Sequence, residues 1–271
     1  MVREPVPPPT IPIVPATQGT SLLRCAEIFH SIQGEGSLMG TESVFVRTTG
    51  CNLRCWFCDT PYTSWEPEGE QLSSREVLDR VLKFGSRHVV LTGGEPLLQP
   101  ALIPLSVALR EQKQHVTVET AGTVYRPVAA DLMSISPKLS NSTPEESRSL
   151  KWSRRHAQQR ENRNVVTRLM AEYLYQLKFV VEQPEDLPEI LTYLEAFPQV
   201  TAERVWLMPE ARTQQEHADK RAWLEPLAAS HGFRFAHGCT SNCGETCGEV
   251  ARFLQRERRE GTTLPPAIAD S

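Results

Sequence analysis

The chain has 271 residues, enough for one domain with a substantial core, and its formal net charge is −4 at neutral pH. This charge gives no field that would attract nucleic acid or a membrane surface, and no apolar run reaches the length of a membrane span. The first residues lack the apolar core of a signal peptide, and seven cysteines, an odd number, argue against a disulfide framework. We therefore expect a cytoplasmic protein with reduced thiols that binds neither nucleic acid nor membranes.

Residues 1–20 form a Pro-rich leader that we expect to be disordered, although a ligand for a proline-reading domain would have the same composition. Over residues 21–235, short apolar runs alternate with helical patterns, which predicts one α/β domain. Strands are expected at Ala26–Phe29, Val44–Arg47, His88–Leu91, His115–Glu119, Leu132–Ser136, Gln176–Val181 and Val205–Leu207. Helices are expected from the capping box Ser73-Ser-Arg-Glu76 toward Phe84, over Leu102–Glu111 and over Leu187–Phe197.

Residues 139–172 interrupt this alternation. The segment is rich in Ser, Arg, Glu, Gln and Asn and has few apolar positions before Val165. Such a run buries too little to order itself, so we expect a solvated polar insertion with a helical end near Arg168 to Tyr175. Ordering of this segment as a lid over the active-site mouth stays open.

Three cysteines, Cys51, Cys55 and Cys58, have the spacing C-x3-C-x2-C. Three thiolates would hold three irons of a [4Fe–4S] cluster and leave the fourth iron open to bind and reduce a ligand. Three buried cysteines, or zinc with a distant fourth ligand, are the alternatives. Packing alone seldom gathers three cysteines within eight residues, because a free buried Cys is only a small hydrophobe.

The cysteine loop, Thr92, Glu119 and Ser136 each follow a predicted strand. Ligands bind at the carboxyl ends of parallel strands, so these motifs should line one mouth.

The cysteine spacing, Phe57 and the run Thr92-Gly-Gly-Glu-Pro96 resemble the radical S-adenosylmethionine (SAM) superfamily. Four further runs are similar to the 7-carboxy-7-deazaguanine synthase (QueE-like) family: Glu27-Ile-Phe-His-Ser-Ile-Gln-Gly-Glu-Gly36, Cys58-Asp-Thr-Pro-Tyr62, Glu119-Thr-Ala-Gly-Thr123 and Ser134-Ile-Ser-Pro-Lys138. The resemblance implies a single-domain partial (β/α) barrel. It also implies a carbon–nitrogen lyase that converts 6-carboxy-5,6,7,8-tetrahydropterin to 7-carboxy-7-deazaguanine with loss of ammonia, on the route to queuosine.

The resemblance also implies a role for each matching residue, with no catalytic residue beyond the cofactors. The cluster is expected on Cys51, Cys55 and Cys58, and Mg²⁺ on Thr60, because this hard octahedral ion takes few protein ligands. SAM is expected on Phe57, Asp59, Gly94, Ser136, Pro137 and Lys138. The pterin is expected on Ile32, Gln33, Gly34, Arg47, Thr92 and Glu119, where an arginine can grip a carboxylate with two parallel bonds. Glu35 and Glu95 are secondary candidates, and Glu95 is expected to hold loop geometry.

In the reaction that the resemblance implies, the adenosyl radical takes a hydrogen from ring carbon C6 and later returns it, so SAM acts as a cofactor. An external electron donor of the flavodoxin or ferredoxin type must reduce the cluster, and members of the family are homodimers. Two other functions stay open. A glycyl-radical-enzyme activase shares the cluster spacing, and a non-catalytic metal-binding module would combine Cys51–Cys58 with Cys239, Cys243 or Cys247.

The tail, residues 236–271, departs from the family pattern. The family ends in a stretch like Pro-x-Leu-His-x-x-Leu-Trp-Gly-Asn-x-Arg-Gly, whereas this chain has three cysteines spaced C-x3-C-x3-C. A second metal site is one interpretation. The other is a frameshift shortly before Ala236, because the codons of residues 236–249, shifted by one base pair-wise into the next codon, permit the family residue at every fixed position. We favour the frameshift.

Overall fold

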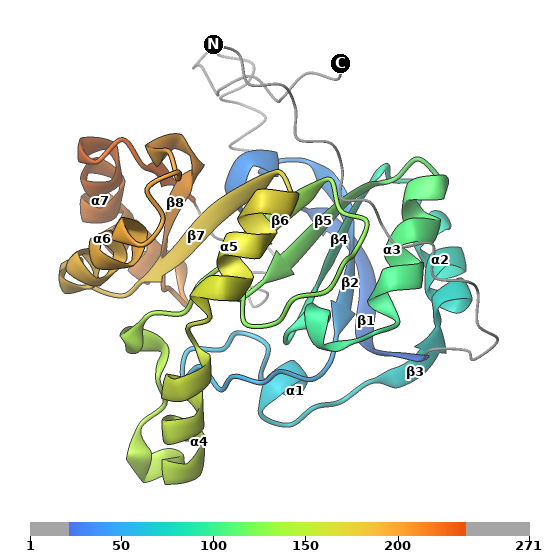
Figure 1. Ribbon diagram of the computed structural model, residues 1–271, viewed down its shortest axis with the longest axis horizontal. Helices are drawn as coiled ribbons and strands as arrows, with labels where there is room; N and C mark the ends of the chain where they lie inside the picture. Colours follow the sequence, from blue (N-terminus) through green and yellow to red (C-terminus); the bar gives the residue numbers. More distant parts are fainter. Residues whose placement is uncertain (1–21, 237–271) are drawn as a thin grey trace.

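The computed structural model describes residues 22–236, which form one nine-stranded sheet with helices packed around it (Figure 1). The strand order is β3-β1-β2-β4-β5-β6-β7-β8-β9. Neighbouring strands from β2 to β9 are parallel, and β1 is antiparallel to β2 and β3. The strands are β1 (Leu22–Ile32), β2 (Glu42–Thr48), β3 (Glu70–Ser73), β4 (His88–Gly93), β5 (His115–Thr120), β6 (Leu132–Ile135), β7 (Tyr175–Val181), β8 (Val205–Pro209) and β9 (Arg234–Phe235).

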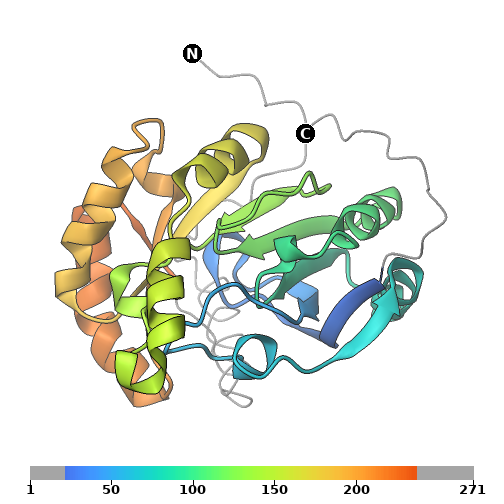
Figure 2. The ribbon, with the colours of Figure 1, turned by 60° about the horizontal axis from the view of Figure 1, so that its bottom comes forward.

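Most helices cover one face of this sheet, which Figure 2 shows as an outer layer around the strands. One helix, α4, instead stands beside α1 and the connection that follows β2 (Figure 1). The helices are α1 (Pro61–Ser64), α2 (Ser74–Leu82), α3 (Leu102–Glu111), α4 (Glu146–Gln159), α5 (Arg163–Glu172), α6 (Leu187–Glu195) and α7 (Gln214–Ser230). A mainly parallel sheet with helices on its outside and β3 and β9 at its edges confirms the predicted α/β partial barrel.

The two faces of the sheet differ in chemistry because successive side chains of a strand point to opposite sides. On the outer face Val44 and Val46 of β2 stand beside Val89 and Leu91 of β4, and these side chains are buried with the helices in one apolar core. The alternate positions belong to the inner face. Arg47 is paired there with Thr92, so the inner face is polar where the outer face is apolar.

The expected strands and helices are confirmed in place, and their ends differ slightly. Strand β4 continues to Gly93, so Thr92 lies within the strand rather than in the loop after it. Glu119 is likewise inside β5. The capping box of α2 is present: Ser73 Oγ accepts a hydrogen bond from Glu76 N, and Glu76 Oε2 accepts one from Ser73 N. Helix α6 ends at Glu195, before the expected Phe197.

The expectation that residues 139–172 do not order themselves is wrong. The segment forms α4 and α5, and the expected helical end at Tyr175 is the first residue of β7 instead. Helix α5 buries Val166, Leu169 and Met170. Helix α4 breaks at Ser149, whose backbone is extended and whose hydroxyl accepts a hydrogen bond from Trp152 N at 3.4 Å, which restarts the helix. Polar partners order α4, and a prediction based on apolar burial does not detect them.

The expectations for the leader (residues 1–20) and for the tail with Cys239, Cys243 and Cys247 fall outside the described residues. Within residues 22–236, no helix is long and apolar enough to cross a membrane.

A matched pair of substitutions tests where the core lies. Leu105 of α3 is fully buried, whereas Leu191 of α6 is exposed. Leu105→Ala should lower the free energy of unfolding by about 2–5 kcal/mol, because it removes apolar contacts and leaves a cavity. Leu191→Ala is the control and should cost far less. Urea unfolding followed by circular dichroism measures both, and equal losses would contradict this description of the core.

Candidate active site

The three motif cysteines lie in the connection between β2 and α1, and all three are free, half-buried thiols. Leu53 N donates a hydrogen bond to Cys51 Sγ at 3.3 Å, and Cys58 Sγ lies 3.3 Å from Ser64 Oγ. In the described part of the chain, no three His, Cys, Asp or Glu side chains are placed to hold a single metal ion. The thiols are thus not gathered around one ion, as zinc requires, and their spread suits a larger group of several irons.

Burial sets the chemistry of two of these thiols. It raises the pKa of Cys51 and of Cys55 to about 12. Thiols with such a pKa stay protonated at neutral pH unless a metal supplies the positive charge that a thiolate needs. The donor set therefore fits an iron–sulfur cluster that ionises the cysteines on binding.

Glycines let the loop after β4 lie directly against the cysteine loop. A Cβ on Gly94 would stand 2.4 Å from the carbonyl oxygen of Gly50, closer than real atoms approach. The same contact is bound by backbone hydrogen bonds, from Gly94 N to Thr48 O at 3.1 Å and from Glu95 N to Gly50 O at 2.9 Å. The run Thr92–Pro96 thus fixes the position of the residue that precedes Cys51.

Glu95 holds the same loop from below. Its fully buried carboxylate accepts hydrogen bonds from Thr120 Oγ1, Ala121 N and Leu97 N at 2.8–3.1 Å. Burial raises the pKa of Glu95, and these donors oppose that rise. Because every bond goes to protein groups of the loop or of β5, Glu95 serves loop geometry.

The remaining residues expected at SAM follow β6 or flank the cysteines. Ser136 N donates to Thr120 O at 2.7 Å, and Lys138 Nζ donates to Ser136 Oγ at 2.8 Å, so Ser136–Lys138 is held beside the end of β5. Phe57 packs edge-on against Trp56, with ring centroids 5.5 Å apart.

Thr60 and Asp59 place two oxygens next to each other. Thr60 is buried, and its hydroxyl lies 3.4 Å from Asp59 Oδ1 and 3.3 Å from Thr63 Oγ1. Cys58 Sγ is 3.9 Å from the same hydroxyl. Oxygen donors of this kind suit Mg²⁺, which keeps most of its waters.

A row of polar side chains crosses the inner face of the sheet. The register of the parallel strands places them side by side. Most are buried, and buried polar groups are costly unless they are hydrogen-bonded. The row consists of Arg47, Thr92, Glu119, Ser134, Gln176 and Lys178.

The connection between β1 and β2 folds across this row, closed at its base by hydrogen bonds between residues 33 and 40–41. Gln33 Nε2 donates to Glu119 Oε1 at 3.1 Å, and Thr92 Oγ1 donates to Glu119 Oε2 at 2.8 Å. Three residues expected at the substrate therefore form one hydrogen-bonded group. Ile32 ends β1 and Gly34 follows Gln33, so both lie at the start of this connection.

Arg47 has a protein partner already. Its Nε lies 2.7 Å from Glu27 Oε1, and the hydroxyl of Tyr62 donates to the same carboxylate oxygen at 2.7 Å. The guanidinium also stands over the Phe29 ring. Glu27 thus orients Arg47 and leaves its other nitrogens for a ligand.

The inner face also contains residues that the sequence analysis did not assign. Lys178 forms a buried ion pair with Glu35, and Gln176 Nε2 donates to Ser134 Oγ at 2.9 Å. Burial opposes the charge of Lys178, but the carboxylates of Glu35 and Glu119 outweigh it and raise the pKa of Lys178. The signal was present in the sequence, because Lys178 interrupts the apolar strand run Leu177–Val181.

Comparisons with known proteins agree with this geometry. Residues 45–138 match the model of the radical SAM superfamily. The chain is 45% identical over 221 residues to a 7-carboxy-7-deazaguanine synthase of Rhodopirellula baltica, covering 81% of this chain and 86% of that protein. It is 44% identical to a 7-carboxy-7-deazaguanine synthase of Halobacterium salinarum, covering 77% and 85%.

The chain belongs to the 7-carboxy-7-deazaguanine synthase family. The structure of QueE from Escherichia coli matches with a TM-score of 0.55 and 23% identity, covering 80% of this chain and 94% of QueE, and so shares the fold. As a radical SAM protein, a member of this family uses a [4Fe–4S] cluster and SAM. Family membership favours the synthase over the glycyl-radical activase and over the metal-binding module.

The contact between Gly94 and Gly50 can be tested directly. Gly94→Ala should force the two loops apart, at a cost of about 1–3 kcal/mol, and should lower the iron bound after anaerobic reconstitution. Gly85→Ala is the control, because φ is +71° there and no atom lies within 4 Å of the added Cβ. It should cost about 1–2 kcal/mol in stability and leave iron binding intact. Equal iron content in the two variants would contradict the proposed fit of the loops.

Proposed function

We propose that this chain is a radical SAM 7-carboxy-7-deazaguanine synthase. It converts 6-carboxy-5,6,7,8-tetrahydropterin to 7-carboxy-7-deazaguanine with loss of ammonia, which makes it a carbon–nitrogen lyase on the route to queuosine. The observation that carries this proposal is the group formed by Gln33, Glu119 and Thr92 on the inner face. An amide, a carboxylate and a hydroxyl in contact offer both donors and acceptors to a flat heterocycle.

Cys51, Cys55 and Cys58 hold the cluster in this proposal, and Phe57, Asp59, Gly94, Ser136, Pro137 and Lys138 surround SAM. The bound cofactors supply a one-electron reduction of SAM and a radical that removes hydrogen from the substrate. The contributions of the chain are positional. Gly94 brings backbone close to the cysteine loop, and Lys138 is held by Ser136 near the same place.

Substrate orientation falls to the inner face. Glu119 accepts hydrogen bonds from N–H groups of the pterin edge, while Gln33 and Thr92 fix the direction of its carboxylate. Arg47 binds the substrate carboxylate through the nitrogens that Glu27 does not engage. Ile32 and Gly34 contribute backbone groups at the start of the connection that crosses the row.

Mg²⁺ is proposed at Thr60, where the hydroxyl would supply one ligand and the substrate and water the others. The support is chemical: a buried hydroxyl beside a carboxylate suits a hard cation.

The resemblance to the family supports three further proposals. The chain works as a homodimer, it receives electrons from a flavodoxin or ferredoxin type of donor, and it acts in the cytoplasm. A reducing compartment would keep Cys51, Cys55 and Cys58 as thiols until the cluster is inserted.

The central test is anaerobic turnover with dithionite, SAM, Mg²⁺ and 6-carboxytetrahydropterin. The wild-type protein should form 7-carboxy-7-deazaguanine, detected by liquid chromatography with mass spectrometry. Cys58→Ala should lose the cluster and all SAM cleavage, because two thiolates are too few to hold the cubane. A Cys58→Ala protein with full iron and activity would refute the cluster assignment, and an iron-loaded wild type without product would refute the substrate.

Thr60→Ala should keep cluster and SAM binding but weaken Mg²⁺ binding by at least about tenfold, since it removes a ligand. Thr60→Ser, which retains the hydroxyl, is the matched control and should stay close to wild type. Turnover measured across a Mg²⁺ titration distinguishes them. The metal assignment is wrong if all three proteins give the same titration curve.

A further inference from the structure

Helix α4 lies beside the cysteine loop, although it comes from the segment that looked like a solvated insertion (Figures 1 and 2). The two residues that it contacts most directly, Arg54 and Trp56, flank Cys55 in sequence. These contacts serve none of the roles assigned above, so the question is what they do for the loop.

Arg54 is held at three points. Its backbone N donates a hydrogen bond to Nδ1 of His156 on α4 at 3.1 Å. Its Nη1 donates to the carbonyl oxygens of Cys51 and Leu53, each at 2.7 Å. Its guanidinium stands over the ring of Trp152, also on α4, 4.0 Å from the centroid. Arg54 thereby closes the loop from Cys51 onto α4.

His156 is fully buried, and its hydrogen bonds define its protonation. Because Nδ1 accepts from Arg54 N, a neutral ring carries its proton on Nε2. Nε2 lies 2.9 Å from Ser142 Oγ, which donates its own proton to Leu139 O at 2.6 Å. Burial lowers the pKa of His156 to about 4, with help from Arg160 and Lys138, so the neutral ring is the stable form at neutral pH.

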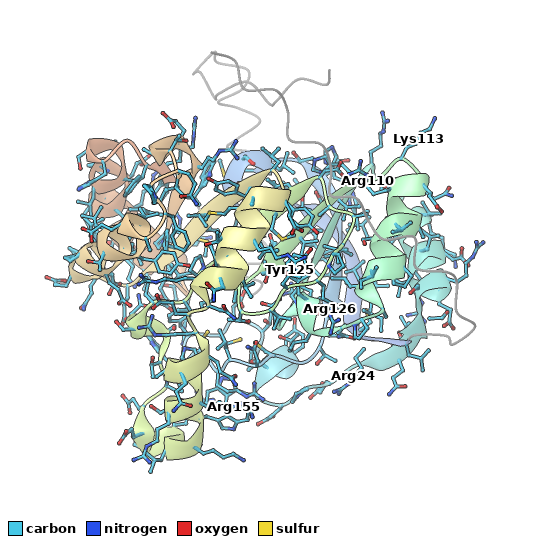
Figure 3. All side chains as sticks on the ribbon, in the orientation of Figure 1. Arg24, Arg110, Lys113, Tyr125, Arg126 and Arg155 are labelled. Atoms are coloured by element: carbon cyan, nitrogen blue, oxygen red, sulfur yellow. The ribbon has the colours of Figure 1, made fainter. Side chains whose placement is uncertain are left out.

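Two more contacts extend the same brace. Trp56 N donates to Ser142 O at 3.1 Å, and Trp56 Nε1 donates to Asn141 O at 2.6 Å. After the end of α4, Arg160 Nη1 donates to Lys138 O at 2.9 Å. Residues 139–160 therefore grip the cysteine loop and the segment Ser136–Lys138 together. Arg155 lies over the same Trp152 ring and extends the basic side of α4 (Figure 3).

We propose that α4 braces the cluster loop and that His156 is a positioning residue, which fixes Cys55 through the backbone N–H of Arg54. The inference rests on the proposed cluster ligands Cys51, Cys55 and Cys58. A hydrogen bond at this N–H orients the peptide that leads into Cys55, and the stack on Trp152 prevents Arg54 from turning out to solvent. The brace keeps the thiolate geometry of the bound cluster and slows its loss.

Isosteric substitutions separate the two bonds of His156. Asn places an oxygen where Nδ1 was and keeps the acceptor for Arg54, whereas Gln places an N–H where Nε2 was and keeps only the bond to Ser142. Phe keeps the ring shape and removes both bonds. Gln158→Ala, at an exposed position of the same helix, is the control.

The experiment reconstitutes each full-length protein anaerobically and measures the rate of iron loss to a ferrous chelator. The electron paramagnetic resonance spectrum of the reduced cluster is recorded as well. His156→Phe and His156→Gln should lose iron roughly 5- to 30-fold faster than wild type and give a heterogeneous spectrum, because a buried donor has lost its partner. His156→Asn and Gln158→Ala should stay close to wild type in both measurements.

Wild-type rates in all variants would overturn the proposal, and so would equally fast loss from Asn and Gln, which would indicate packing alone. If the His156 variants fail to fold by circular dichroism, Trp152→Leu at its half-buried position replaces them. It should accelerate iron loss, and an unchanged rate there would overturn the proposal. A wild-type protein that takes up no cluster would instead refute the proposed cluster ligands.

Discussion

The close approach of two backbones, at Gly94 and Gly50, is the constraint on which the site depends. No side chain fits between these loops, so their separation is set by hydrogen bonds from Gly94 and Glu95 to Thr48 and Gly50. Thr48 ends β2, and Gly94 follows β4, which pairs with β2 in parallel. The sheet thus dictates the position of the cysteine loop before any cofactor is bound, and Glu95 extends this control to β5 through Thr120.

The inner face carries more charge than a sheet ordinarily tolerates. Arg47 is balanced by Glu27, and Lys178 by Glu35, whereas Glu119 is stabilised by the amide of Gln33 and the hydroxyl of Thr92. Buried charges need partners of this kind, because a charge removed from water without compensation costs several kcal/mol. The arrangement leaves Glu119 as a carboxylate with neutral neighbours in direct contact, which suits recognition of a heterocycle rich in N–H groups.

Much of the fold follows from the sequence, because buried strands such as His88–Gly93 and capped helices such as Ser74–Leu82 have strong local patterns. The motif residues of the site were found for a similar reason, since Gly94 and the cysteines are adjacent in short runs. Lys178 and His156 were missed because their roles depend on partners far away in the chain. The same holds for α4, which is ordered by bonds to Arg54 and Trp56 rather than by an apolar stripe.

The contact between Arg54 and His156 joins residues that are 102 positions apart. At a synthesis rate of about 5–20 residues per second, His156 leaves the ribosome roughly 5–20 s after the cysteine loop. During that interval the N–H of Arg54 has only water as a partner, and the thiols occupy an unbraced segment. We expect productive cluster insertion to follow the completion of α4 rather than the emergence of the cysteines, which makes metal loading a late event in the maturation of the chain.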